Sequence, residues 1–386
     1  MLSRDELAAW LRLATTPGIS RGRARQLLAA LGSAERVLAA DERTLQALVG
    51  PDVIHTLKRC DARDEALLAT TLRWLESAQG EAPRDIVVLG DPRYPELLLE
   101  TADPPLLLFT LGRVELLSTP SVAIVGSRSA TPQGMDNARS FARFLSEHGL
   151  TIVSGLAMGI DGSAHEGGLA GPGSTVAFVG TGLDRVYPAR HAALCRRIAE
   201  QGLVASEYPL GAEALPINFP RRNRLIAGIA RGTLVVEAAI ESGSLITARM
   251  ALECGREVFA IPGSIHSPQS RGCHQLIQEG AKLVETGADV LQELRLAAGV
   301  PRATLSPTQP SLFAPPATPA SGGDGRTDGP DAALRAALGY DPVTFDVLAA
   351  RTGLPPDQLA ARLLELELSG VVQRLPGGLL QRCATA

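Results

Sequence analysis

The chain has 386 residues, and 45% of them are hydrophobic, which is enough for more than one buried core. Its 39 glycines and 27 prolines follow no repeat, so a collagen-like or globally disordered chain is excluded. The 37 Lys and Arg residues against 41 Asp and Glu give a formal net charge of −4, which excludes a positive coat over the whole surface. Any site for a polyanion therefore has to be local.

The cysteines and the apolar segments narrow the class of protein further. The five cysteines include no CxxC pair and no tight cluster with histidine, which argues against a structural zinc site and favours reduced thiols. No apolar run is long enough to cross a membrane, and the first residues, MLSRDELAAWLRL, do not read as a signal peptide. We therefore expect a cytoplasmic protein without a metal or a membrane span.

The first predicted domain, residues 1–80, is helical, because leucines recur there at helical spacing. Between its first two predicted helices, residues 16–24 (TPGISRGRA) form a glycine-containing turn, followed by a helix with basic residues at its start. This pattern is typical of a helix-hairpin-helix, whose backbone N–H groups can bind phosphate, and equally of a plain helical turn with solvated arginines. We expect a small domain of the SAM or helix-hairpin-helix kind.

The middle of the chain predicts a large sheet domain. Residues 81–120 are expected to be a proline-rich connector with short strands at 86–89 and 106–109. In residues 121–295, short apolar segments alternate with helical patterns, which predicts an α/β domain with a doubly wound, Rossmann-like parallel sheet. Ligands of such sheets bind at the carboxyl ends of the strands. The predicted strands of this domain cover residues 122–125, 151–154, 175–179, 203–206, 233–237, 257–261 and 282–284.

The C-terminal part begins with residues 296–330, whose prolines and glycines predict a flexible linker. Residues 331–386 read as three helices followed by a hairpin, which predicts a winged helix. The third of these helices, residues 357–369, has more acidic than basic side chains, unlike a helix that reads duplex DNA. We therefore expect this module to bind duplex DNA weakly and to contact protein instead.

Three predicted strands end in turns of small residues that can hold an anion at the start of the next helix. The first turn consists of Gly126, Ser127 and Arg128. Another consists of Ser242, Gly243 and Ser244. Each also reads as an ordinary tight turn or helix cap without a ligand. In the third turn, within residues 154–165, Asp161 and His165 lie one helical turn apart. Two ligands are too few for a metal, so we expect a helix cap and a packed histidine.

Residues 219–224 (FPRRNR) place three arginines and one asparagine after an aromatic ring, at the predicted start of a helix. No acidic residue dilutes the cluster, so a solvated helix face explains it poorly. Arginine contacts with phosphates, together with a base stacked on the ring, describe the binding of single-stranded nucleic acid. The candidate residues are Phe219, Arg221, Arg222, Asn223 and Arg224.

The sequence contains no P-loop and no HExxH motif, so we expect no enzyme and no cofactor. Two other classes of protein stay open. A nucleotide-processing enzyme similar to the LOG phosphoribohydrolases would use the same glycine turns, but its PGGxGTxxE motif is replaced here by ESGSLITA. A pure interaction scaffold would use the arginine run for an acidic partner.

Taken in order, the motifs of the central domain resemble those of the DNA-processing protein A (DprA/Smf) family. They are VAIVGSR at 122–128, SGLAMGIDGSAH at 154–165, GTGLDRVYP at 180–188, SEYP at 206–209, FPRRNR at 219–224, VEAAIESGSLITA at 236–248 and VFAIPGS at 258–264. The resemblance implies a bacterial cytoplasmic protein that binds and protects single-stranded DNA and loads the RecA recombinase onto it during natural transformation. It also implies a homodimer through the central domain and no established catalytic activity.

The resemblance places DNA contacts at residues 126–128 and 219–224. Met158 stands where many members of the family carry arginine, which leaves the site more dependent on Arg128 and the arginine run. Because phosphate contacts and one ring carry the binding, we expect an affinity that falls steeply with salt and little sequence preference. Replacing Arg128 or Arg222 by alanine is expected to lower affinity on all sequences while the fold is retained.

Overall fold

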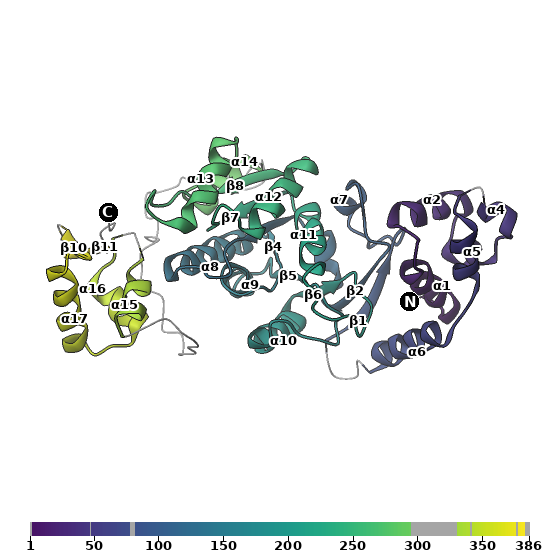
Figure 1. Ribbon diagram of the computed structural model, residues 1–386, viewed down its shortest axis with the longest axis horizontal. Helices are drawn as coiled ribbons and strands as arrows, with labels where there is room; N and C mark the ends of the chain where they lie inside the picture. Colours follow the sequence, from purple (N-terminus) through teal and green to yellow (C-terminus); the bar gives the residue numbers. More distant parts are fainter. Residues whose placement is uncertain are drawn as a thin grey trace.

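The structure, a computed structural model, describes residues 2–46, 48–77, 82–294, 330–339, 342–375 and 377–382. The linker predicted at residues 296–330 lies almost entirely outside the described residues. Figure 1 shows the N-terminal helices at one end of the long axis, the sheet in the middle, and the C-terminal helices and hairpin at the other end.

The N-terminal helices pack around leucines of their own. Leu7, Leu27, Leu45 and Leu57 are buried together, and each comes from a different helix. The last and longest of these helices begins at a capping box, in which Asp61 and Asp64 each accept a backbone N–H of the other. The helices are α1 (Arg4–Thr15), α2 (Arg21–Leu31), α3 (Ala34–Ala39), α4 (Glu42–Gln46), α5 (Pro51–Lys58) and α6 (Ala62–Glu76).

Within the described ranges, the central sheet has nine strands in the order β1-β2-β6-β5-β4-β3-β7-β8-β9. From β6 to β9 each neighbouring pair runs parallel, which confirms the predicted doubly wound sheet. The strands are β1 (Arg84–Val88), β2 (Leu107–Gly112), β3 (Ser121–Val125), β4 (Thr151–Ser154), β5 (Thr175–Phe178), β6 (Leu203–Ser206), β7 (Gly232–Val235), β8 (Glu257–Ala260) and β9 (Lys282–Leu283).

The segment predicted to be a connector, residues 81–120, contributes β1 and β2 to this sheet. β2 pairs antiparallel with both β1 and β6. Phe109 of β2 is buried in the same core as the N-terminal helices, and its ring meets Trp74 of α6 edge-on with the centroids 6.2 Å apart. The sequence pattern did not show that β2 belongs to the central sheet, because its partner strand β6 lies far along the chain. The limits of the predicted domains stay predictions.

Helices cover both faces of the central sheet (Figure 1). Successive side chains of β3 point to opposite faces, so that Ile124 packs with one group of helices and Val125 with the other. One group comprises α8 (Pro132–Glu147), α9 (Ile160–Gly168), α10 (Ala192–Gln201) and α14 (Gly287–Glu293). The other comprises α11 (Asn218–Ile229), α12 (Gly243–Glu253) and α13 (Arg271–Gln278), with the short α7 (Glu96–Leu99) beside α11.

The C-terminal module has the three helices and the hairpin that the sequence predicts. They are α15 (Pro330–Leu338), α16 (Phe345–Thr352), α17 (Pro356–Leu368), β10 (Val372–Leu375) and β11 (Leu379–Arg382). Arg351 of α16 contacts α8, donating to Gln133 at 2.9 Å and pairing with Asp136 at 3.3 Å. Among the described helices, none is long and apolar enough to cross a membrane.

Candidate nucleic-acid interface

The strand order of the sheet reverses between β3 and β7, and the loops after these two strands meet at its carboxyl edge. The backbone N–H of Ser127 donates to the carbonyl oxygen of Glu237 at 2.7 Å and joins the two loops. Gly126 is needed for this approach, because a Cβ there would lie 2.6 Å from Ile160 and 2.9 Å from the Glu237 oxygen. The hydroxyl of Ser127 is buried and accepts the N–H of Ser129. Gly126 and Ser127 therefore shape the loop.

Arg128 is exposed at this edge, and its guanidinium lies 5.8 Å from the centre of the Phe219 ring. Phe219 comes from the first turn of α11 and is half-buried. The ring of Tyr187 lies 5.3 Å from the Phe219 ring and is 51% exposed. A cation and a second aromatic ring thus both contact Phe219, an arrangement that can contact a phosphate and stack bases. Of the predicted site residues, Arg128 and Phe219 are brought together.

Tyr187 was not among the candidates named from the sequence. It lies in GTGLDRVYP, a motif on which the family resemblance rests, so a signal for this segment was present. Periodicity did not single it out, because the loop is neither helix nor strand. Its contact with Phe219 depends on how the loop after β5 folds back onto the start of α11.

Arg222 is predicted to contact phosphate, but the structure places its side chain in the interior of the protein. Only 3% of the residue is exposed. Its guanidinium donates to the carbonyl oxygens of Gly155 and Phe178, which follow or end β4 and β5. Burial lowers the pKa of Arg222 to about 10, opposed by the nearby carboxylate of Asp161. The residue therefore holds two strand ends together, and this position argues that its removal would destabilise the fold.

Asp161 and His165 complete this buried cluster. The carboxylate of Asp161 accepts the N–H groups of Gly155 at 3.1 Å and Ala157 at 3.2 Å, so it orders the loop before α9 and does not cap the helix. Burial raises the pKa of Asp161, and the charge of Arg222 opposes that rise. His165 is packed, as expected, and burial lowers its pKa to about 3. No group of three or more metal-ligating side chains occurs among the residues described.

Arg224 is engaged in an ion-pair cluster that joins α2 to the sheet. It pairs closely with Glu207, the residue after β6. Arg21 of α2 pairs with the same carboxylate at 3.0 Å and with Asp103 at 2.6 Å. Burial raises the pKa of Glu207, and the charges of Arg224 and Arg21 oppose that rise. Arg224, a predicted phosphate contact, and Arg21 are therefore both engaged by acidic residues of the chain itself.

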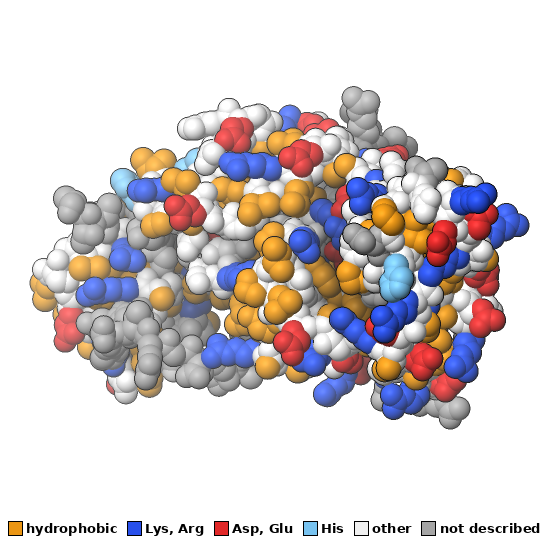
Figure 2. Space-filling model, turned by 45° about the vertical axis from the view of Figure 1, so that its right-hand side comes forward, with side chains coloured by type: hydrophobic (Ala, Val, Ile, Leu, Met, Phe, Trp, Pro, Cys, Tyr) orange, Lys and Arg blue, Asp and Glu red, His pale blue; other side chains and the backbone are white. Residues whose placement is uncertain are grey.

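The arginine run thus separates into different roles. Arg221 is exposed on α11, whereas Arg222 and Arg224 face inward. Asn223 is half-buried and accepts from the Nε of Arg222 at 3.2 Å. On the face that Figure 2 presents, Lys and Arg side chains lie scattered among hydrophobic and acidic ones.

Glu237 occupies the position where many Rossmann-like proteins hold a phosphate. Its carboxylate accepts the backbone N–H of Thr131 at 2.9 Å and the Thr131 hydroxyl at 2.5 Å, at the start of α8. Gly134 in the first turn of α8 packs directly against this carboxylate. The negative charge satisfies the helix N-terminus. A nucleotide phosphate would have to displace Glu237 to bind there.

The turn at the start of α12 caps the helix, and its two serine hydroxyls bond within the turn. The Ser242 hydroxyl accepts the N–H of Ser244 at 3.3 Å and lies 2.6 Å from the Ser244 hydroxyl. Gly243 is exposed, and a Cβ there would meet open space. Among the described residues, no hydrogen bond or ring contact joins this turn to Arg128 or Phe219. DNA contacts at these three residues stay a prediction.

The fold and this site define a Rossmann-like α/β protein with a winged helix, whose carboxyl edge carries a cation and aromatic rings in place of a free phosphate cradle. Residues 85–295 match the family model for DNA recombination-mediator protein A, and residues 314–378 match the model for the DprA winged helix domain. The chain belongs to the DNA recombination-mediator protein A family, as its motifs predicted.

Relatives and solved structures agree with this assignment. The chain is 41% identical to Protein Smf of Escherichia coli K12 over 318 residues, 81% of this chain and 80% of that protein. It is 52% identical to the DNA processing protein DprA of Streptococcus pneumoniae over 203 residues, 53% of this chain and 72% of the relative.

Two solved structures align with the fold. The X-ray structure of DNA processing protein A from S. pneumoniae has a TM-score of 0.59 at 38% identity, covering 76% of this chain and 98% of that one. DNA processing protein A from Helicobacter pylori, whose structure concerns single-stranded DNA binding, has a TM-score of 0.50 at 30% identity. That alignment covers 55% of this chain and 96% of the other.

Proposed function

We propose that this chain binds single-stranded DNA through Arg128, Tyr187, Phe219 and Arg221. The observation that carries the proposal is that the Arg128 guanidinium and the Tyr187 ring both contact the Phe219 ring at the carboxyl edge of the sheet. Bases stack on rings of this kind whatever their sequence, and arginine forks contact phosphates. The H. pylori relative, described as binding single-stranded DNA, supports the same class of ligand.

The enzyme alternative fits this edge less well. A phosphoribohydrolase similar to the LOG family would need a nucleotide phosphate at a helix N-terminus of the sheet. At α8 that position holds the carboxylate of Glu237. Strand binding by Arg128 and the two rings requires no phosphate there and no chemical step. We therefore propose a binding protein without catalytic activity.

We further propose that the bound strand is handed to the RecA recombinase during natural transformation. The family description, a recombination mediator, supports this step. The test is the rate at which RecA assembles on single-stranded DNA with and without the chain. An unchanged rate over a range of protein concentrations would contradict the proposal.

A homodimer through the central domain is proposed with it. β9 is the last strand of the described sheet, and Leu283 on it is 44% exposed. An open edge with an apolar side chain favours association. The molar mass in solution, measured by sedimentation over a range of concentrations, tests this, and a mass of one chain throughout would contradict it.

Fluorescence anisotropy with labelled oligo-dT tests the DNA site. Alanine at Phe219 or Tyr187 should weaken binding by about 1–3 kcal/mol each, or roughly 5- to 150-fold, because each removes one stacking surface. Tyr187→Phe should bind like the unchanged chain. Arg249→Ala, which removes an exposed arginine from α12, is the matched control and should bind normally. Full competition by a mononucleotide would favour the enzyme alternative.

A further inference from the structure

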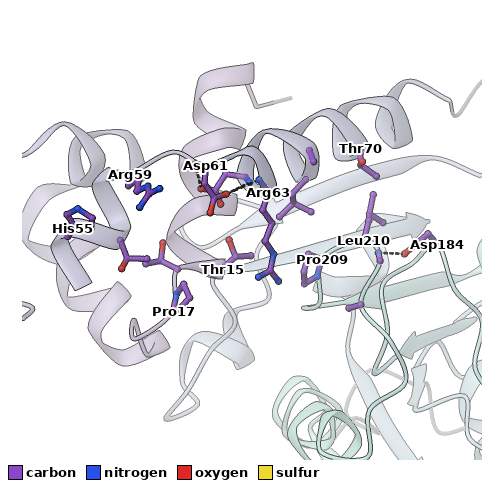
Figure 3. A pocket seen from close by; sticks show the side chains of 17 residues that line it. Thr15, Pro17, His55, Arg59, Asp61, Arg63, Thr70, Asp184, Pro209 and Leu210 are labelled. Atoms are coloured by element: carbon purple, nitrogen blue, oxygen red, sulfur yellow. Dashed lines mark hydrogen bonds between the residues drawn. The ribbon is translucent and has the colours of Figure 1, made fainter. Parts of the chain in front are cut away.

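A large cavity opens between the N-terminal helices and the carboxyl edge of the sheet. Its volume is about 780 Å³. One wall consists of the end of α1, the turn after it, α5 and the start of α6, and the other consists of residues 209–212, the loop after β6. Figure 3 shows the side chains that line it. The turn at residues 16–17, part of the predicted helix-hairpin-helix, lines it as well.

Two guanidinium groups of this cavity form no hydrogen bond or ion pair with the residues that the structure describes. In Figure 3, Arg63 extends from α6 toward Pro209 on the opposite wall, and Arg59 lies further along the helical wall near His55. The two groups belong to Arg59 and Arg63, and neither side chain appears in a hydrogen bond or an ion pair within the described part of the chain. Elsewhere in the molecule Arg21, Arg222 and Arg224 all bond acceptors of the chain itself.

The carboxylates of the cavity are occupied by backbone groups. Asp61 accepts the N–H groups of Arg63 at 2.8 Å and Asp64 at 3.0 Å, and Asp64 accepts the N–H of Asp61 at 3.3 Å. Across the cavity, Asp184 accepts the N–H of Gly211 at 2.8 Å. The acids therefore order the walls, whereas the two arginines have their donors available for a ligand.

The cavity borders the proposed DNA site. Asp184 lines it, and Tyr187 follows three residues later in the same loop. That loop is pinned to the cavity wall, because the N–H of Gly182 donates to the carbonyl oxygen of Ala212 at 3.0 Å. The hydroxyl of Tyr208, beside the wall, donates to the carbonyl oxygen of Asn218, which precedes Phe219. The loop that carries Tyr187 thus also forms part of the cavity wall.

The two ends of the sheet edge differ in what covers them. Beyond β3 and β7, the winged helix contacts the edge, and Leu338 and Val343 face Thr131 and Glu237 across a cavity of only about 30 Å³. At the β6 end, the ion pairs of Glu207 with Arg21 and Arg224 hold the helices against the sheet without filling the large cavity. A DNA strand that leaves the two aromatic rings therefore has space in the direction of the N-terminal helices.

We infer that the cavity binds the backbone of the same single-stranded DNA, with Arg59 and Arg63 as phosphate contacts. The inference rests on the proposed function. It makes the N-terminal helices part of the binding track, so that the length of DNA bound exceeds what the rings and Arg128 can cover.

The test compares Arg59→Ala/Arg63→Ala with the unchanged full chain on oligo-dT of about 5 and about 16 nucleotides. Each single-strand phosphate contact contributes about 0.7 to the slope of log affinity against log salt. The double variant should therefore lose about 1.4 of that slope and about 25-fold in affinity at about 0.1 M salt on the long oligonucleotide. On the short one it should bind like the unchanged chain. Arg4→Ala/Arg43→Ala, which removes two exposed arginines outside the cavity, is the control.

A second variant, expected to raise the affinity for DNA, distinguishes a lost contact from misfolding. Asp61→Asn keeps an equally good helix cap for α6 but removes a negative charge close to Arg59 and Arg63. It should raise the affinity for the long oligonucleotide by about two- to five-fold and leave the short one unchanged.

The outcomes separate this inference from the proposed function. If neither oligonucleotide binds the unchanged chain, the proposed function fails. If both bind but the Arg59/Arg63 double variant equals its control, the cavity does not hold DNA and the inference alone is overturned. Equal losses on the short and the long oligonucleotide would also overturn it, because the contacts would then belong to the ring site. If the occupant of the cavity is an acidic protein segment, the double variant would likewise bind DNA as its control does, and the inference would be overturned.

Discussion

Arg222 donates a hydrogen bond of 2.5 Å to the carbonyl oxygen of Gly155, from the centre of a run that reads as a ligand-binding patch. The residue before it, Arg221, is exposed to solvent. Adjacent residues on a helix point in different directions, so one faces the sheet and the other faces outward. The two arginines therefore have separate roles, and mutation distinguishes them.

Arg222→Ala should lower the stability of the fold by about 3–5 kcal/mol, because it leaves the Asp161 carboxylate buried without its cation. Arg221→Ala should change stability by less than about 0.5 kcal/mol and should weaken single-strand binding instead. Denaturant unfolding and anisotropy on both variants check this. A stable Arg222→Ala protein with a selective loss of DNA affinity would contradict the structural role.

Met158→Arg should strengthen single-strand binding. Met158 is half-buried beside Gly159, which packs against the backbone of Ser127 and Arg128, so a cation there adds to the field of Arg128. One added phosphate contact should raise affinity by about five-fold at about 0.1 M salt and steepen the salt slope by about 0.7. Met158→Gln is the uncharged control. Equal binding of the two variants would place residue 158 outside the DNA track.

The buried histidine should make stability depend on pH. Thr175 donates its hydroxyl to Ile152, so it accepts from the Nδ1–H of His165, and the Nε2 accepts the N–H of Leu156. Burial, with the charges of His191 and Arg222, lowers the pKa of His165 to about 3 from the ordinary 6.5. The unfolded chain thus binds one more proton between these values, and stability falls as pH falls through that window.

Comparison with His165→Gln isolates this contribution. The free energy of unfolding of the unchanged chain should fall more steeply than that of the variant, by about 1.4 kcal/mol per pH unit below pH 6.5. Urea unfolding at several pH values measures both slopes. Parallel slopes would show that His165 is protonated in the fold, against its packing.

The winged helix should contribute little to duplex DNA binding. Two of its arginines are paired, Arg351 with Asp136 of α8 and Arg374 with Glu367. The helix α17 exposes Leu364 and Leu368. A chain that ends at residue 295 should therefore match the full chain in duplex affinity at physiological salt. Tight duplex binding that is lost on truncation would contradict this, whereas binding of a protein partner would be lost with the module.

Much of the fold could be predicted because its signals are local. Apolar runs between glycines located the strands from β3 to β9 to within a few residues, and helical spacing located the N-terminal and C-terminal helices. The pairing of β2 with β6 could not be found this way, because its partner lies about a hundred residues further on. At the site, Arg128 and Phe219 were identified from residue type and position, and their contact agrees with that choice.

The amino-acid sequence by itself determined the family, the order of helices and strands, and the motifs that gather at the carboxyl edge of the sheet, because these depend on neighbours along the chain. Only the tertiary structure decided which arginines are available. Arg222 and Arg224 meet Gly155 and Glu207 from other parts of the chain, while Arg128 stays exposed beside Phe219. The net charge of −4 left the location of positive charge open. Burial and ion pairing settled it, since both arise from contacts between residues that are distant in sequence.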